Sequence, residues 1–162
     1  MLRVGVVGAG VMGSNHGRVL AGLPGIELIG IVDPMLEHRT RATKLIGCPT
    51  FSDLESLIAA GVDAVTIAAP THLHHQVALA CIAKGIHVLV EKPIASTVEE
   101  GREIVEAARK AGVTLMGGHV EPFNPAVAAG QQASQAAADL PVALPPGAPF
   151  TPRVHAGGAG PA

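Results

Sequence analysis

The segment Glu91-Lys92-Pro93 places two ionisable side chains directly after the largely apolar residues 86–90. An isolated Glu–Lys pair is usually a solvated surface ion pair of little consequence. At the end of a buried parallel strand the pair can instead belong to a binding site, because ligands bind outside the carboxyl ends of such strands. A lysine there can pass a proton to or from a hydroxyl group. We therefore single out Lys92 as the candidate catalytic residue and expect Pro93 to keep it extended.

Three glycines near the N-terminus, Gly8, Gly10 and Gly13, have the spacing G-x-G-x-x-G and follow the apolar residues 4–7. In a dinucleotide site the first permits a tight turn, the second lets the backbone approach a pyrophosphate, and the third lets the next helix pack on the strand. The N-terminus of that helix favours phosphate. The predicted cofactor contacts in this segment are Gly8, Ala9, Gly10, Val11, Met12 and Gly13.

Asp33 ends a second largely apolar stretch, residues 27–32, and lies 20 residues after Gly13. A carboxylate at this distance can accept hydrogen bonds from the adenosine ribose of a dinucleotide. The plainer alternative is an aspartate that begins a helix before a proline. Because a carboxylate repels a 2′-phosphate, Asp33 favours NAD over NADP. Arg39 and Arg41 are close enough in sequence to keep NADP open as the less favoured cofactor.

A third turn, after the apolar residues 63–68, contains a proline and three histidines. His72, His74 and His75 cannot all converge on one face at helical spacing, and no cysteine or carboxylate is placed to complete a metal site. We therefore predict no metal. A turn that contacts the cofactor at the carboxyl edge of the sheet is the better interpretation. The predicted contacts from this turn and from the strand after it are Ala69, Pro70, Thr71, His74, Glu91 and Lys92.

Apolar strand patterns alternate with helical patterns along most of the chain. We expect strands at 3–7, 27–32, 63–68, 86–90 and 113–116, a short extended link at 49–51, and helices at 11–22, 35–46, 53–60, 73–84 and 97–111. Short connections between alternating elements indicate right-handed βαβ units. The fold class predicted is α/β, with a Rossmann-type doubly wound parallel sheet.

The character of the sequence changes near residue 128. Six of the thirteen prolines lie between Pro141 and Pro161, among alanines and glycines, and no apolar period is visible. Such composition is typical of disordered segments. We expect a dinucleotide-binding domain at 1–127 and a disordered or frameshifted tail at 128–162.

Composition limits the class of protein. The 162 residues hold no Trp or Tyr and only three Phe, so the core must be aliphatic, and a net charge of −2 argues against nucleic acid as a partner. Cys48 and Cys81 are isolated and are expected to be reduced in a cytoplasmic protein. No signal peptide is recognisable, and no apolar stretch approaches the roughly 20 residues of a membrane-spanning helix.

The glycine motif, Asp33, Pro70-Thr71 with His74, and Glu91-Lys92-Pro93 together resemble the Gfo/Idh/MocA family of NAD(P)-dependent oxidoreductases. Residues 118–127 look most like the sugar-nucleotide and inositol-type dehydrogenases of that family, and the resemblance covers about residues 2–127. It implies a nucleotide domain followed by a substrate domain, and hydride transfer between the cofactor and a sugar, sugar-nucleotide or cyclitol hydroxyl or ketone. It also implies that Lys92 is the catalytic lysine and that Glu91 lies near the nicotinamide.

The chain departs from the family pattern at Pro122, where arginine is usual, and after residue 127, where the substrate domain is expected to be absent. A small-molecule substrate would then need a complementary domain, and we expect little or no activity alone. The sheet edge left exposed would favour self-association. The alternative function is a non-enzymatic, NAD-binding regulatory or interaction module.

Overall fold

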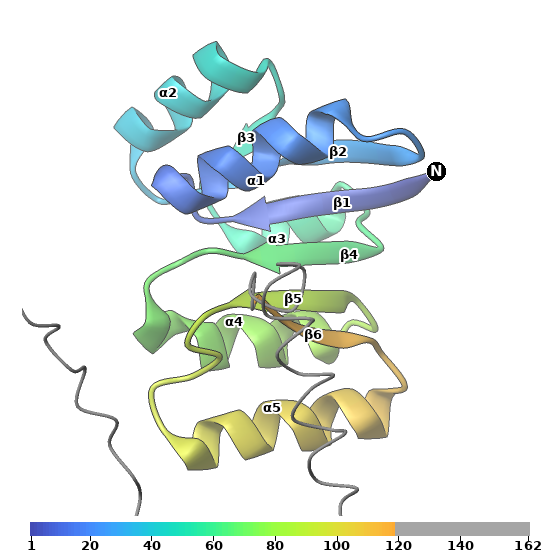
Figure 1. Ribbon diagram of the computed structural model, residues 1–162. Helices are drawn as coiled ribbons and strands as arrows, with labels where there is room; N and C mark the ends of the chain where they lie inside the picture. Colours follow the sequence, from blue (N-terminus) through green and yellow to red (C-terminus); the bar gives the residue numbers. More distant parts are fainter. Residues whose placement is uncertain (119–162) are drawn as a thin grey trace, which may run out of the picture. The chain divides into compact units, whose positions relative to one another are not determined.

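The computed structural model describes residues 1–118. Six strands form one parallel sheet in the order β3-β2-β1-β4-β5-β6 (Figure 1). The strands are β1 Leu2–Val7, β2 Ile26–Val32, β3 Thr50–Phe51, β4 Ala64–Ile67, β5 His87–Glu91 and β6 Leu115–Gly118. The helices are α1 Val11–Gly22, α2 Leu36–Ile46, α3 Leu54–Ala59, α4 Thr71–Ile82 and α5 Val98–Ala111. The predicted Rossmann-type, doubly wound sheet is confirmed.

The chain builds the sheet outward from β1 in one direction and then in the other, so the winding reverses between β1 and β4. Ligands bind at such a reversal, outside the carboxyl ends of the strands. The strand ends are level there, because Val7 pairs with both Val32 and Ile67, and Ile67 pairs with Val90. The register therefore brings the segments that follow β1, β2, β4 and β5 to one edge.

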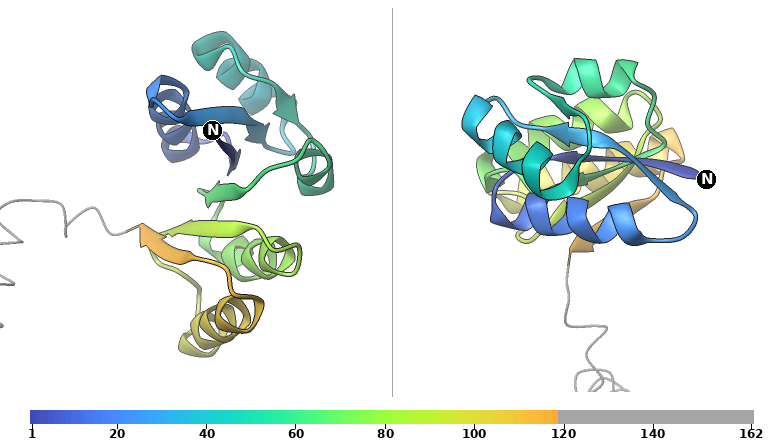
Figure 2. Two further views of the ribbon diagram at one scale, coloured as in Figure 1. Left: turned by 90° about the vertical axis from the view of Figure 1, so that its right-hand side faces the viewer. Right: turned by 90° about the horizontal axis from the view of Figure 1, so that it is seen from above.

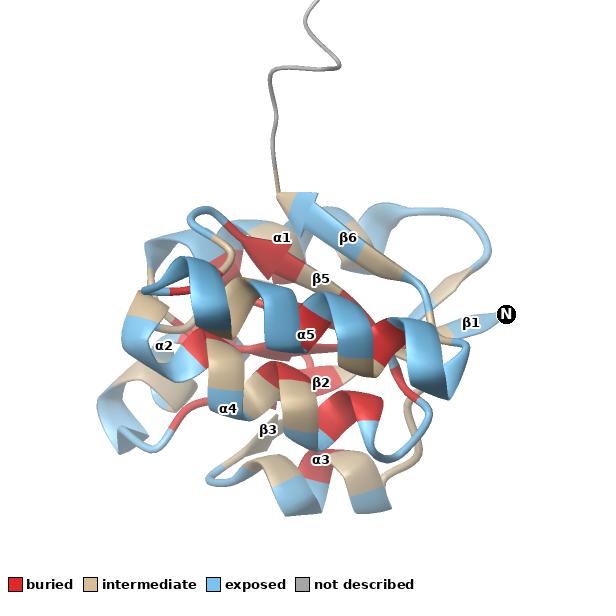
Figure 3. Ribbon diagram, turned by 90° about the horizontal axis from the view of Figure 1, so that it is seen from below, coloured by how far each residue is buried: buried red, intermediate tan, exposed pale blue. Residues whose placement is uncertain are grey.

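Helices cover both faces of the sheet (Figure 2). On one face α1 and α2 pack on β1 and β2 through a small cluster that includes Val6, Ile31 and Ala42. On the other, α3, α4 and α5 pack through a larger aliphatic cluster that includes Leu57 and Ile104. The buried residues lie where helices meet strands (Figure 3), as expected for a parallel sheet enclosed by helices.

Local signals set most element ends. The best example is α5, where Thr97 and Glu100 form a reciprocal capping box and Gly112 ends the helix in the left-handed conformation. Asp53 caps α3 by accepting a hydrogen bond from the backbone N–H of Ser56.

Two predicted boundaries need correction. The helix predicted at 73–84 runs from Thr71 to Ile82, because Pro70 takes the N-cap position. The last strand begins at Leu115 instead of residue 113, because the N–H of Val113 still bonds back to the carboxyl end of α5.

Both cysteines are buried and free. Burial raises the pKa of the Cys48 thiol, and it raises that of Cys81 to about 12. No helix within residues 1–118 is long and apolar enough to cross a membrane. The predicted boundary at 127/128, the tail at 128–162 and Pro122 lie outside the described residues.

Candidate functional site

The glycine turn after β1 shows a different constraint at each glycine. Gly8 has φ +101°, and a Cβ there would lie 2.6 Å from the carbonyl oxygen of Ala68, so the turn is pressed against the end of β4. A Cβ on Gly13 would collide with the carbonyl oxygen of Gly8. A Cβ on Gly10 would meet no atom within 4 Å among the described residues that surround the turn. The fold therefore requires Gly8 and Gly13, whereas Gly10 borders open space.

The N-terminus of α1 faces this open space without a side-chain cap. Gly10 is the N-cap residue, it offers no side-chain hydrogen bond, and the first turn holds no acidic residue. Val11 is 76% exposed and Met12 49% exposed. Free N–H groups at a helix N-terminus suit an anion. The predicted contacts at 8–13 thus surround a place suited to phosphate.

Asp33 directly follows β2, beside the glycine turn, and is only 7% exposed. Its Oδ2 accepts hydrogen bonds from the N–H of Ala9 (2.9 Å) and from Nδ1 of His38 (3.1 Å), and its Oδ1 accepts from the N–H of Met35 (2.9 Å). Burial raises the pKa of Asp33, but these three partners outweigh it and hold that pKa below its usual value. Asp33 is therefore a fixed carboxylate at the position predicted for ribose recognition.

Two arginines of α2 lie around Asp33 and bond to backbone carbonyls. Nη1 of Arg39 donates to the carbonyl oxygens of Asp33 (2.7 Å) and Pro34 (2.9 Å). Nη2 of Arg41 donates to the carbonyl oxygen of Ala9 at 3.3 Å. These are the two arginines that left NADP as the less favoured cofactor in the sequence analysis. Their guanidinium groups are engaged by the backbone next to Asp33 and by the glycine turn.

The second half of the site is a small cavity of about 250 Å³ at the carboxyl ends of β4 and β5. It joins α1 to the two later turns, which are far apart in sequence. Its lining residues are Met12, Ala68, Ala69, Pro70, Thr71, His74, Glu91 and Lys92. The fold therefore brings the predicted contacts from three segments to one cavity.

Glu91 is nearly buried, at 8% exposed, and Lys92 is exposed. Oε1 of Glu91 lies 2.7 Å from Nε2 of His16, and its Oε2 accepts a hydrogen bond from the N–H of Lys92 at 3.1 Å. The Lys92–Pro93 peptide bond is cis. Glu91 thus joins the first helix to the lysine turn. Sequence reasoning did not select His16, although it lies three residues after Gly13, on the same helix as the motif.

His74 is 1% exposed, and both of its ring nitrogens are used within the protein. Nδ1 lies 2.9 Å from the carbonyl oxygen of Pro93, and Nε2 lies 2.8 Å from that of Ala69. The sequence grouped His74 with the residues that contact the cofactor. Its placement leaves no ring nitrogen free for a ligand, so it contributes to the site by bonding to the two turns.

The neighbouring histidines do not join it. His72 is exposed, and Nε2 of His75 lies 2.7 Å from Oε2 of Glu103 on α5. Across residues 1–118, no group of three or more His, Cys, Asp or Glu side chains is arranged to hold a metal ion.

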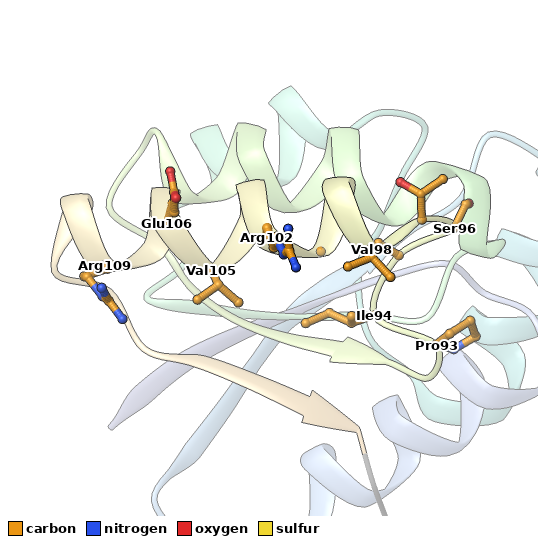
Figure 4. Close-up of a pocket in the computed structure, with 11 residues that line it drawn as sticks. Pro93, Ile94, Ser96, Val98, Arg102, Val105, Glu106 and Arg109 are labelled. Atoms are coloured by element: carbon orange, nitrogen blue, oxygen red, sulfur yellow. The ribbon is translucent and has the colours of Figure 1, made fainter.

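A larger cavity, of about 670 Å³, lies along α5 and the segment before it (Figure 4). Val98, Arg102, Val105 and Arg109 line it from the helix, and Pro93 and Ile94 line it from the segment before the helix. It includes neither the glycine turn, nor Asp33, nor Lys92. The smaller cavity is therefore the candidate site, because the residues able to do chemistry lie there.

Comparison with known proteins agrees with this geometry. The family model described as "Oxidoreductase family, NAD-binding Rossmann fold" (GFO_IDH_MocA) matches residues 2–119. Inositol 2-dehydrogenase 4 of Saccharopolyspora erythraea is 41% identical over 128 residues, which cover 76% of this chain and 38% of that protein. UDP-N-acetylglucosamine 3-dehydrogenase of Acidithiobacillus ferrooxidans is 32% identical over 154 residues, 94% of this chain and 47% of that protein.

Among solved structures, the WlbA dehydrogenase from Bordetella pertussis, in complex with NADH and UDP-GlcNAcA, superposes with a TM-score of 0.78 at 31% identity. The match covers 83% of this chain and 42% of that one. The chain spans about two fifths of the length of these relatives. By its sequence and its fold, the chain belongs to the Gfo/Idh/MocA family of oxidoreductases and contains that family's NAD-binding Rossmann domain.

Proposed function

We propose that this chain is the cofactor-binding part of an oxidoreductase that transfers hydride between NAD and a hydroxyl or ketone of a sugar, sugar nucleotide or cyclitol. One observation carries the proposal: the start of α1, the β4–α4 turn and Lys92 line one cavity, next to the glycine turn and the reversal of the sheet. The named relatives are inositol and UDP-N-acetylglucosamine dehydrogenases, which supports this substrate class.

The residues present suit each part of the cofactor. Asp33 offers a fixed carboxylate to the adenosine ribose, and the turn at Gly10 with the N-terminus of α1 offers N–H groups to the pyrophosphate. The nicotinamide end would lie against Ala69, Pro70 and Thr71. When bound, the nicotinamide supplies the hydride carrier that the side chains lack.

The chain's own chemical contribution is at Lys92. Lys92 is exposed and lines the cavity, and Glu91 bonds to its backbone N–H. We assign Lys92 the transfer of a proton to or from the substrate oxygen, with Glu91 and His16 as positioning residues. Substrate orientation and exclusion of water depend on residues beyond those that line this cavity.

Calorimetry with NADH and NADPH tests the binding step. We expect NADH to bind and Asp33→Ala to weaken it by roughly tenfold or more, since hydrogen bonds to a charged group contribute about 1.5–3 kcal/mol. NADPH should bind more weakly to the wild type, because its 2′-phosphate meets a carboxylate. Failure to bind either cofactor at millimolar concentration would reject the proposal.

Turnover tests the role of Lys92. The longest available form of the protein is assayed with NAD and a panel of cyclitols and UDP-sugars. Lys92→Met should abolish oxidation and leave NADH binding within about twofold, as expected for a proton-transfer residue. The alternative, a non-enzymatic NAD-binding module, is favoured by three results together. NADH binds, no panel member is oxidised, and Lys92→Met pulls down the same protein partners in the presence of NAD as the wild type does.

A further inference from the structure

His74 lies between the two turns that line the candidate cavity. It projects from the first turn of α4 and reaches the carbonyl oxygens of Ala69, in the turn after β4, and of Pro93, in the turn after β5. The N···O distances are 2.8 and 2.9 Å, and the side chain is 1% exposed. The ring and its two contacts are therefore enclosed by protein.

Both partners of the ring are hydrogen-bond acceptors. A neutral imidazole carries one N–H and one lone pair, so it can donate to only one of two carbonyl oxygens. Its other nitrogen would then point a lone pair at an oxygen less than 3 Å away, in a buried setting where an unmade hydrogen bond is costly. Rotating the ring by half a turn does not help, because carbon atoms would replace both nitrogens.

A doubly protonated ring satisfies both contacts. An imidazolium donates from Nδ1 and from Nε2, and such charge-assisted bonds are roughly twice as strong as neutral ones. The nearly buried carboxylate of Glu91 lines the same cavity and offsets part of the cost of burying the charge. The other titratable groups around the cavity are His16, which lies 2.7 Å from Glu91, Lys92, which is exposed, and His75 and Glu103, which contact each other.

His87 provides a contrast within the same sheet. Its Nδ1 accepts a hydrogen bond from the backbone N–H of Thr114 at 2.9 Å, which requires a bare nitrogen. It lies at the start of β5, at the opposite edge of the sheet from the candidate cavity. His74 and His87 therefore have opposite hydrogen-bonding demands.

We propose that His74 is a positioning residue that donates hydrogen bonds from both ring nitrogens, and thereby joins the Ala69 turn to the Pro93 turn and sets where Lys92 meets the cofactor. The inference rests on the proposed function for the identity of the ligand. The charge of the ring has a second effect. It lies behind the place assigned to the nicotinamide, whose oxidised form is positive, so it favours NADH over NAD⁺.

Nitrogen NMR of protein labelled at histidine tests the double donation directly. His74→Gln identifies the His74 signals by their loss, and His87→Gln identifies those of His87. We expect both His74 nitrogens to give the signal of a protonated, donating nitrogen in the folded protein, and His87 to show a bare Nδ1 in the same sample. A bare nitrogen on His74 in the folded protein would overturn the proposal.

Cofactor binding tests the positioning role. His74→Gln keeps one donor and removes the charge, while His74→Phe keeps the ring shape and removes both donors. We expect NADH affinity to fall about tenfold for Phe and less for Gln. For Gln, the ratio of NAD⁺ to NADH dissociation constants should fall about threefold, because the repulsion of NAD⁺ is gone. A purely structural role would not move that ratio, and His87→Gln should leave both affinities unchanged.

The outcomes separate the two proposals. Wild-type protein that binds no NADH rejects the proposed function, while the NMR result still decides the protonation of His74. Wild-type binding together with unchanged affinities in His74→Gln, whose folding is checked by circular dichroism, rejects the positioning role alone. If His74→Phe fails to fold, His74→Gln is sufficient to decide.

Discussion

The two halves of the candidate site are built in different ways. Around β1 and β2 the site is shaped by backbone: two glycines, Gly8 and Gly13, that tolerate no side chain, an uncapped helix N-terminus and a carboxylate bonded mainly to N–H groups. Around β4 and β5 it is shaped by buried side chains, with His16 on Glu91 and His74 on two carbonyls. The first kind is visible in a sequence because it depends on residue types at short spacing. The second depends on contacts between distant segments.

The largest expected effect separates two glycines of the first half. Gly13→Ala should prevent folding or cost about 4 kcal/mol or more, because its methyl group would collide with a backbone carbonyl. Gly10→Ala is the matched control, since its methyl group meets open space among the described residues. Thermal melts should show Gly10→Ala near the wild type, and calorimetry should show that it has lost NADH affinity. Equal melting temperatures for the two variants would break the distinction between structural and ligand-facing glycines.

The next effect concerns Asp33 and acid. Its pKa is lowered in the folded state, so the ionised carboxylate stabilises the fold at neutral pH. This contribution to the free energy of unfolding begins to fall as the pH drops below about 4, the usual pKa of an aspartate, and is lost as the pH passes through the folded-state pKa. Asp33→Asn should cost about 2 kcal/mol at pH 7, because one amide oxygen cannot replace a carboxylate that accepts from Ala9, Met35 and His38.

Urea unfolding between pH 2 and pH 7 measures this dependence. The difference between wild type and Asp33→Asn should shrink as the pH is lowered. Glu99→Gln, at an exposed position in the first turn of α5, serves as the control and should track the wild type closely. A constant difference at all pH values would mean that the charge of Asp33 does not contribute to stability.

The second half predicts a smaller, coupled effect. His16→Gln and Glu91→Gln should each destabilise by about 1 kcal/mol, and the double variant should cost less than the sum, because the 2.7 Å contact is lost only once. Denaturant unfolding of the four proteins gives the coupling directly. Additive costs would show that His16 and Glu91 act independently, and the two halves of the site would then not be joined through α1.

The same contrast explains what could be predicted. The strands and most helices follow from apolar runs between glycine and capping residues, so β1, β2 and α5 match the expected ranges closely. The cofactor motif and Asp33 follow from spacing. The start of α4 at Thr71 was missed because Pro70 was interpreted only as part of a turn. The contact between His16 and Glu91 spans 75 residues and depends on the register of β1, β4 and β5, which no local pattern encodes.

The smallest expected effect uses one buried thiol in each cluster as a reporter. Cys48 belongs to the cluster beneath α2 and is 8% exposed, whereas Cys81 belongs to the cluster beneath α4, is 0% exposed and has a pKa raised to about 12. Thiols react as thiolates and need access, so reaction reports local opening. Single-thiol variants Cys81→Ala and Cys48→Ala, treated with a disulfide reagent at pH 8, should show Cys48 reacting first.

NADH should slow the reaction of Cys48 more than that of Cys81, because the proposed ribose and pyrophosphate contacts lie on the first half of the site and ligand binding stabilises the closed state. Urea-unfolded samples give the reference rate for each thiol. Equal protection factors for the two cysteines would mean that both clusters open together. The two halves of the site would then differ in how they are built but not in how readily they open.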